Sequence, residues 1–268
     1  MKEHRGYVEG KWGLMHYRLR GEGAPLLLLH QTPWTSLQYT NATPFLADGR
    51  QVIALDTPGY GTSDAPPAPP SIQDYADSIP GFLDGLDMDR VDVLGHHTGA
   101  LIAGAFAARH PERVDKLILH GAPVYDADER ADRLGKPHFD QTPKLDGSHL
   151  LDYWNLLQRV IGPNAHPEGI HTGVLSFYLN GSEEWYGHTA AFKYDFAADI
   201  PSLQGPALIV SNTADMLAQH AERLRALRPD FGYCEIPDGS SNIIFDEPEK
   251  WAKPIASWLD SRAPSLKQ

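Results

Sequence analysis

The chain has 268 residues, of which 41% are hydrophobic and 22% charged, as expected for a globular protein with one large domain or a domain with an insertion. Its 23 Lys and Arg residues against 35 Asp and Glu residues give a net charge of −12 without any basic block, which argues against nucleic acid or an anionic membrane as a partner. The single cysteine, Cys234, excludes an internal disulfide and any C-x-x-C metal or redox motif.

The N-terminal stretch MKEHRGYVEGKWG has no apolar core of the kind that a signal peptide needs. No later window reaches the length of a membrane span. We therefore expect a soluble, cytoplasmic protein.

Extended segments alternate with helical ones along the chain. Gly6–Val8 and Leu14–Leu19 predict a short antiparallel pair, and the continuous apolar run Pro25–His30 is typical of a parallel strand that is covered on both faces. Further strands are predicted at Gln51–Leu55, Val91–Leu94, Lys116–Leu119, Ala207–Val210 and Gly232–Ile236, and helices at Ile72–Leu86, Thr98–Arg109, Ala218–Leu227 and Glu249–Ser261. Strands separated by such helices imply βαβ crossovers, so the predicted fold class is α/β with a mostly parallel sheet.

Residues 125–194 break this alternation. The interval is rich in Trp, Tyr and His, lacks clear strands and contains a helix-like stretch at His149–Val160. We interpret it as a helical cap over the carboxyl ends of the strands, where open α/β sheets bind ligands. The predicted organisation is a core formed by residues 1–124 and 195–268, with residues 125–194 as the cap.

The stretch VDVLGHHTGALIAG, Val91 to Gly104, joins an apolar strand to an Ala-rich helix through a Gly-x-x-x-Gly turn. Many enzymes present a nucleophilic serine at the centre of such a turn, in the pattern G-x-S-x-G. Here the central residue is His97. Gly95 and Gly99 satisfy the steric demand of a turn where neighbouring backbone passes close by.

Five segments occur in an order that resembles the α/β-hydrolases: LLLLHQTPWTS, VIALDTPGYGTSD, VDVLGHHTGALIA, ALIVSNTAD and IPDGSSNIIFDEPEKWAKPIASWL. They are most similar to the cap-bearing branch of epoxide hydrolases and haloalkane dehalogenases. The resemblance implies an α/β-hydrolase fold with a helical cap inserted after strand 6. It also implies that His97 occupies the nucleophile position, that Asp215 is the acid, and that Ser241 stands where the family has its histidine.

The exchange of residue types leaves several mechanisms open. His97 could act as general base toward the hydroxyl of Ser241, with Asp215 orienting one of them. Alternatively, His97 takes a proton directly from water or substrate, a role that suits imidazole near neutral pH and also allows lyase, isomerase or cyclase chemistry. His97 as a covalent nucleophile ranks third. Loss of both family residues could also leave a non-catalytic small-molecule binder. However, His97 is larger than the family's residue and Ser241 is smaller, so the summed side-chain volume is nearly conserved. Random loss of the two residues need not have conserved it.

The resemblance also implies an oxyanion site. Its two donors map onto two backbone N–H groups. One belongs to Thr98, directly after the elbow, the tight turn centred on His97, and the other to Thr32 in the sequence His-Gln-Thr-Pro. The glycine usual in the family is Gln31 here. Such a site favours carbonyl or enolate chemistry, although Thr98 could equally be an ordinary residue at the start of a helix.

Aromatic and histidine residues predict the wall of a pocket for a small apolar molecule. Some of them are expected to pack the cap on the core instead, and His149, at the start of a predicted helix, could reach the pocket or face solvent. We expect His96 to point away from His97 into packing. The candidate substrate-binding residues are Gln31, Trp34, His149, Trp154, Trp185 and His188.

The sequence favours chemistry without a metal or organic cofactor. The chain has 13 histidines, but only His96 and His97 are adjacent, and no H-x-x-x-H or H-E-x-x-H spacing occurs. No G-x-G-x-x-G motif follows the first strand, and no Walker sequence is present. We therefore expect a cofactor-independent hydrolase that acts on an ester, lactone or activated C–C bond in a small apolar carbonyl compound. The sequence does not specify the oligomeric state.

Overall fold

An eight-stranded sheet forms the centre of the computed structural model, which describes residues 2–163, 165–183 and 185–261. The strand order is β1-β2-β4-β3-β5-β6-β7-β8. The strands are β1 (His4–Gly10), β2 (Gly13–Arg20), β3 (Ala24–Leu29), β4 (Arg50–Leu55), β5 (Val91–His96), β6 (Val114–His120), β7 (Ala207–Ala214) and β8 (Gly232–Ser240). β2 runs antiparallel to β1 and β4, and every other neighbouring pair is parallel, as the sequence predicts.

The apolar character of the central strands follows from burial on both faces. In β3, Leu27 and Leu29 belong to one hydrophobic cluster, whereas Leu26 and Leu28 belong to another. Successive side chains of a strand point to opposite faces, so a strand with two covered faces must be apolar at every position. The run Pro25–His30 has this composition for that reason.

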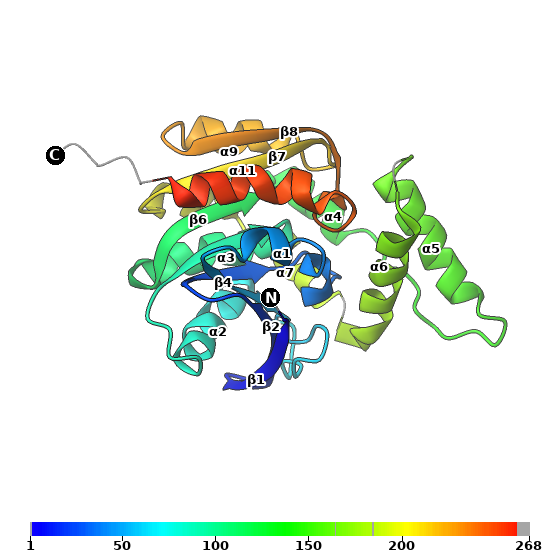
Figure 1. Cartoon of the computed structure of the whole chain (residues 1–268). Helices are drawn as coiled ribbons and strands as arrows, with labels where there is room; N and C mark the ends of the chain where they lie inside the picture. The colour runs from blue at the N-terminus through cyan, green and yellow to red at the C-terminus, as the bar shows by residue number, and fades with distance from the viewer. Residues whose placement is uncertain (1, 164, 184, 262–268) are drawn as a thin grey trace.

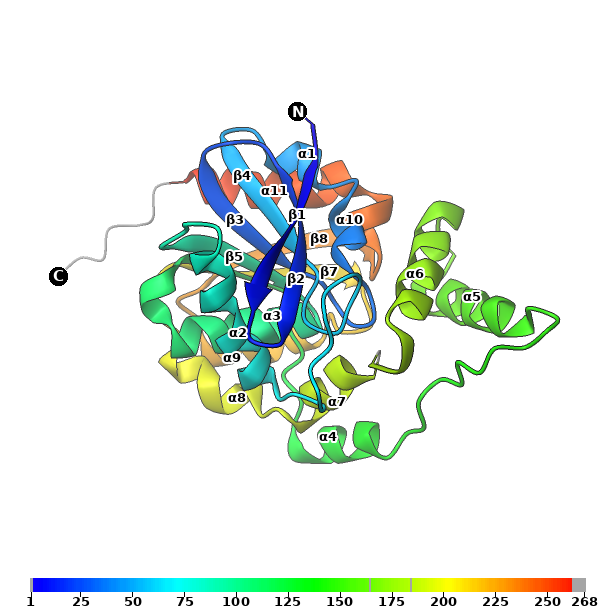
Figure 2. The same ribbon diagram turned by 90° about the horizontal axis from the view of Figure 1, so that it is seen from below.

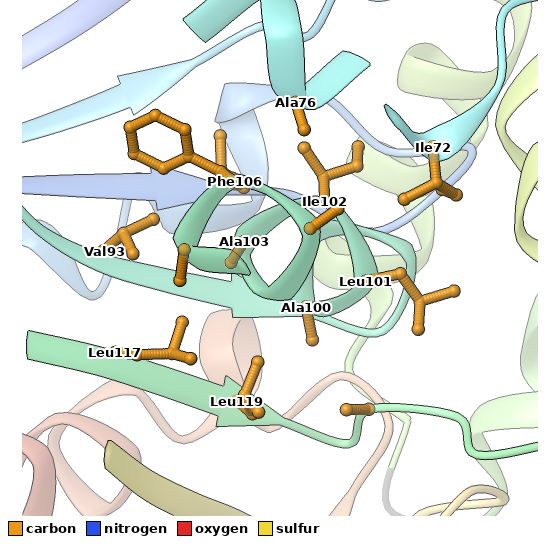
Figure 3. Close-up of a cluster of buried hydrophobic side chains, with 14 of the residues drawn as sticks. Ile72, Ala76, Val93, Ala100, Leu101, Ile102, Ala103, Phe106, Leu117 and Leu119 are labelled. Carbon is orange, nitrogen blue, oxygen red and sulfur yellow. The ribbon is translucent and has the colours of Figure 1, made fainter. Parts of the chain in front are cut away.

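Helices cover both faces of the sheet (Figures 1 and 2). α2 and α3 supply much of the larger cluster, in which Ile72 of α2 lies near Ile102 of α3, and Phe106 of α3 lies near Val93 of β5 (Figure 3). α1, α10 and α11 supply the other. The core helices are α1 (Thr43–Leu46), α2 (Ile72–Asp84), α3 (Thr98–Arg109), α9 (His220–Leu227), α10 (Ile243–Asp246) and α11 (Pro248–Asp260), with short 3₁₀ helices η1 (Ser36–Tyr39) and η2 (Pro111–Arg113).

Within the described residues, all regular secondary structure between β6 and β7 consists of helices. Its helices are α4 (Ala127–Leu134), α5 (Ser148–Ile161), α6 (Pro167–Leu179), η3 (Gly181–Glu183), α7 (Tyr186–Lys193), α8 (Phe196–Asp199) and η4 (Ile200–Ser202). α5 coincides within one residue with the predicted helix His149–Val160, while α4, α6 and α7 were not predicted individually. Figures 1 and 2 show α5 and α6 as a pair to one side of the sheet layers.

Helices of the insertion pack against the core at several places, two of which involve α7 and α6. α7 packs against α2 and α3, and α6 packs against η1, which follows β3. Both contacts lie near the carboxyl ends of the strands, where the predicted site residues are found. Among the described helices, none combines the length and hydrophobicity that a bilayer crossing requires.

Candidate active site

The turn between β5 and α3 holds His97 in an uncommon backbone conformation. Its φ is 50° and its ψ −112°, a region that residues other than glycine adopt at a cost and that clusters at functional sites. A Cβ on Gly95 would lie 2.0 Å from the carbonyl oxygen of Gly99, and one on Gly99 would lie 2.1 Å from that of Leu29. The two glycines are therefore required for the backbone crossing that supports His97, as the sequence predicts.

His97 forms a direct pair with Asp215, which lies just after β7. The distance between His97 Nε2 and Asp215 Oδ2 is 2.9 Å, and the backbone N–H of Leu217 donates to Oδ1 at 2.6 Å. Burial acts to raise the pKa of Asp215, but the neighbouring His97 and the Leu217 N–H outweigh it and lower this pKa to about 2. Asp215 is thus an ionised acceptor near neutral pH.

The proton positions on His97 follow from this pair. Because a carboxylate only accepts, the neutral imidazole carries its proton on Nε2 and its lone pair on Nδ1. A Cβ on Gly121 would lie 2.6 Å from His97 Cδ2 and 2.9 Å from Nε2, so that edge of the ring faces Gly121. Nδ1 has no hydrogen-bond partner among the described residues and is not fully enclosed. It is the ring atom available to act as a base.

Gly121 must remain a glycine for His97 to keep this position. Its φ is +57°, and the added Cβ of an alanine would overlap the imidazole. We expect Gly121→Ala to lower the free energy of unfolding by about 1–3 kcal/mol and to reduce activity, because the ring is pushed away from Asp215. Urea denaturation measures the first effect. Gly147→Ala is the control, because that glycine also has a positive φ, +72°, but nothing lies within 4 Å of an added Cβ; equal stability of the two variants would contradict the packing described here.

Behind His97, the ring of His96 stacks between His97 and His120. The ring centroids are 4.0 Å from His97 and 4.3 Å from His120. The expectation that His96 points away from His97 is therefore wrong: the elbow places the His97 ring beside the end of β5. Burial, followed by the neighbouring histidines, lowers the pKa of His96 well below its ordinary value, and burial lowers the pKa of His120 to about 4. Two neutral imidazoles thus lie behind the catalytic candidate.

A chain of hydrogen bonds fixes His120 and the loop after β8. The indole N–H of Trp251 donates to His120 Nδ1 at 3.1 Å, so Nε2 carries the proton and donates to Asn212 Oδ1 at 2.5 Å. The Asn212 amide donates in turn to the carbonyl oxygens of Gly239 and Ser240, at 3.1 and 2.6 Å. This chain holds the backbone that leads directly into Ser241.

His96, His97 and Asp215 each offer one atom to a cluster in which these atoms lie within 4.8 Å of one another, which raises the question of a metal. Gln38 accepts from the N–H of Gln31, so its amide donates to His96 Nδ1, and His96 Nε2 is protonated. The Nε2 of His97 is likewise occupied by its proton toward Asp215. These donors do not fit a shared metal ion.

Two neighbouring cavities open at His97, with volumes of about 250 and 90 Å³. Four residues line both cavities: Thr32, His97, His188 and Met216. The larger cavity is otherwise mostly apolar and is lined by Gln31, Pro33, Trp34, Tyr153, Leu156, Leu157, Val160, Ile161, Ser241 and Asn242. The smaller is lined by Thr98, Pro123, Tyr125, Arg133, Ala191, Phe192 and Leu217. His97 therefore lies at their junction.

Most of the predicted site residues meet at these cavities. Ser241 lines the larger one, but its Oγ is buried and has no hydrogen-bond partner among the described residues, so no bond joins it to His97. Thr98 is the first residue of α3, where a backbone N–H has no acceptor within the helix. Gln31, Thr32, Trp34 and His188 contribute to the walls.

Three predicted substrate-binding residues lie elsewhere. His149 accepts from the N–H of Lys144 and packs against Tyr178. Trp154 packs with the aliphatic and aromatic residues that join α5 to α6, and Trp185 packs against His138. None of the three lines either cavity. The helical period explains Trp154, because Tyr153, Leu157 and Ile161 form the buried side of α5.

Other wall residues were missed by sequence reasoning. Arg133 and Met216 carry no motif, although Met216 directly follows the predicted acid. Gly121 and Asn212 lie at the ends of β6 and β7, and their position at the carboxyl edge of the sheet was the available signal.

Comparison with known proteins agrees with this architecture. A family model described as alpha/beta hydrolase fold matches residues 24–152. The crystal structure of the enol-lactonase from Burkholderia xenovorans LB400 aligns over 96% of this chain and 100% of that chain, with a TM-score of 0.80 and 22% identity. This chain has the α/β-hydrolase fold. The fold class predicted from the sequence is thus confirmed.

Several of the curated relatives are named hydrolases. The (E)-2-((N-methylformamido)methylene)succinate hydrolase of Acinetobacter baylyi is 25% identical over 92% of this chain and 94% of that protein. A 2-hydroxymuconate semialdehyde hydrolase of a Pseudomonas species is 38% identical over 38% of each. The chain spans 31% of the length of an uncharacterized protein of Mycobacterium tuberculosis, at 38% identity over 40% of the chain.

Proposed function

We propose that this protein is a cofactor-independent hydrolase of a small, largely apolar carbonyl compound, an ester, a lactone or a compound with an activated C–C bond. The observation that carries the proposal is the His97–Asp215 pair: the His97 side chain, whose Nδ1 has no hydrogen-bond partner among the described residues, lines both cavities together with two candidate backbone donors. The names of the relatives support hydrolysis of small compounds, a lactone among them. Membership of the epoxide hydrolase and haloalkane dehalogenase branch remains a prediction, as does the role of residues 125–194 as a cap.

The proposed reaction begins with proton transfer. His97 Nδ1 takes a proton from a water molecule while the water oxygen attacks the substrate carbonyl carbon. The resulting imidazolium is stabilised by the Asp215 carboxylate on the opposite edge of the ring. The backbone N–H groups of Thr32 and Thr98 stabilise the oxyanion, and the positive N-terminal end of α3 adds to this effect.

Collapse of the tetrahedral intermediate completes the reaction. The electron pair on the oxyanion re-forms the carbonyl, and the bond to the leaving group breaks. His97 returns its proton to the leaving group, so the acid product contains the water oxygen and the imidazole is neutral again. The neutral rings of His96 and His120 fit this cycle, because they add no positive charge beside the transient imidazolium.

Turnover in ¹⁸O-labelled water tests the proposal. A panel of aryl esters, lactones and 1,3-diketones is incubated with the protein, and the products are analysed by mass spectrometry. Hydrolysis incorporates one ¹⁸O atom into the product acid. Turnover without ¹⁸O would indicate lyase or isomerase chemistry with His97 as base, and the absence of turnover across the panel would favour a binding protein.

Ser241 distinguishes the two hydrolytic routes. Because its Oγ is not bonded to His97, we expect Ser241→Ala to retain turnover within about threefold of the unmodified protein, below the 10²-fold loss typical of a missing catalytic group. A fluorophosphonate is expected to leave no adduct on the GSSN peptide. A serine adduct on that peptide, together with loss of activity in Ser241→Ala, would instead establish Ser241 as the nucleophile.

A further inference from the structure

Arg133 lacks the ion pair that the other arginines make. Every arginine that the structure describes forms a salt bridge with a carboxylate, apart from Arg133 and Arg159. Arg159 lies on the exposed side of α5, whereas Arg133 lines the smaller cavity. In a chain with a net charge of −12, an unpaired guanidinium beside the candidate base is unusual.

The neighbours of Arg133 on α4 explain why no side chain neutralises it. Glu129, one turn earlier on the helix, accepts two hydrogen bonds from Arg223 and caps the backbone of Asp126. Arg130 is paired with Asp195. The carboxylates near this part of α4 are therefore engaged with other cations.

Aromatic rings hold the guanidinium at the cavity wall. Its central carbon lies 4.5 Å from the ring centroid of Tyr125 and 5.6 Å from that of Phe192. Stacking engages the face of a guanidinium and leaves N–H groups on its edge free to donate. A planar carboxylate matches that edge with two parallel hydrogen bonds.

The charges around the two cavities favour an anion. No Asp or Glu is among the residues that line either cavity. His188 lines the smaller cavity together with Arg133 and His97, and its pKa is lowered to about 4 by burial and by the nearby His138, His97 and Arg133. His188 is thus neutral near neutral pH, which leaves Arg133 as the charged group on the wall of the smaller cavity.

Given the hydrolytic function proposed above, we infer that the substrate carries a carboxylate, which binds in the smaller cavity against Arg133. The apolar part of the substrate then occupies the larger cavity, between Trp34 and the inner face of α5. His97 lies where the two cavities meet, so the scissile carbonyl lies between the carboxylate and the apolar group. The substrate class is an acid that bears an ester, lactone or ketone carbonyl between its charged and apolar ends.

Two esters that differ only in charge test this inference: 4-nitrophenyl hydrogen glutarate and the corresponding 4-nitrophenyl ester of glutaramic acid. We expect kcat/KM near neutral pH to be about 10–100-fold higher for the acid, the usual effect of a charge-assisted hydrogen bond. Arg133→Gln is expected to abolish this preference and Arg133→Lys to keep part of it. Arg159→Gln, the matched control, should keep all of it. A wild-type protein without the preference, or a preference that survives Arg133→Gln, would overturn the inference.

Calorimetric binding separates this inference from the proposed hydrolysis. 4-Phenylbutyrate and 4-phenylbutyramide are titrated into the wild-type, Arg133→Gln and Arg159→Gln proteins, and no turnover is required. Tighter binding of the acid that is lost only in Arg133→Gln supports the carboxylate site even if every ester proves inert. Equal affinity for acid and amide in the wild-type protein contradicts it. If Arg133→Gln fails to fold by circular dichroism, the Arg133→Lys variant is titrated instead.

Discussion

Replacing His97 with alanine is expected to lower turnover by about 10²–10⁴-fold, the usual contribution of a positioned general base. The substitution removes Nδ1, the ring nitrogen not engaged by Asp215, and leaves Asp215 with its Leu217 contact. Alanine is smaller than histidine and adds no contact with Gly121, so the variant should fold. The measurement is kcat/KM on the best ester of the panel, with circular dichroism to confirm the fold.

His171→Ala is the matched control, because His171 is an exposed histidine of α6. It should leave kcat/KM unchanged. A folded His97→Ala protein with full activity would remove His97 from the mechanism. Restoration of part of the activity by added imidazole would strengthen the assignment, because it replaces the missing base.

The second large effect is expected for Asp215→Asn, which should lower kcat by about 10²–10⁴-fold although its shape is nearly that of the original residue. The amide of asparagine can donate to His97 Nε2, and the imidazole then carries its proton on Nδ1. Nδ1, the proposed base, would become a donor and could not accept a proton from water. Asp215→Glu, which keeps the charge but shifts it, should retain more activity than Asp215→Asn; the reverse order would exclude this account.

Stability against pH supplies a readout of the same variant that does not depend on substrate. The pKa of Asp215 is lowered to about 2 in the folded protein, below its ordinary value of 3.8. A lowered pKa means that the carboxylate stabilises the fold above about pH 4 and that this contribution is lost as the pH falls toward 2. The free energy of unfolding should therefore fall less between about pH 6 and pH 3 in Asp215→Asn than in the wild-type protein. An identical fall in both proteins would mean that Asp215 is not ionised beside His97.

The sequence was sufficient to predict the sheet because the central strands contain runs of apolar residues, as in Leu26–Leu29 of β3 and Leu117–Leu119 of β6. Val91–Leu94 and Ala207–Val210 were expected as strands, and the structure extends them to His96 and Ala214, where polar residues begin. Those polar ends contain or precede the site residues. Strand composition depends on local burial, which a single sequence reveals, and this is why the core could be predicted.

The pair of His97 with Asp215 was expected only as part of a three-residue set. The turn and the acid are each marked by local motifs, but the absence of a hydrogen bond to Ser241 depends on side-chain directions at two separate loops. Trp154 shows the same limit: a helix was correctly predicted at α5, but a rotation by one residue decides that Tyr153 faces the cavity. Arg133 could not be found because its significance is the lack of a partner, which only a folded structure reveals.

The hydrogen bonds of the site join residues that are far apart in the chain. His97 and Asp215 are separated by 118 positions, His120 and Asn212 by 92, and Trp251 and His120 by 131. Contacts between residues so far apart in the chain form only after long loops have closed, and loop closure costs conformational entropy. This cost is offset when the whole sheet and its last helix, α11, have packed. A nascent chain that has completed α3 already contains the turn at His97. It does not yet contain the carboxylate of Asp215 or the indole of Trp251, which order the site. The site is therefore assembled at the end of folding, and its catalytic geometry reports on the integrity of the entire domain.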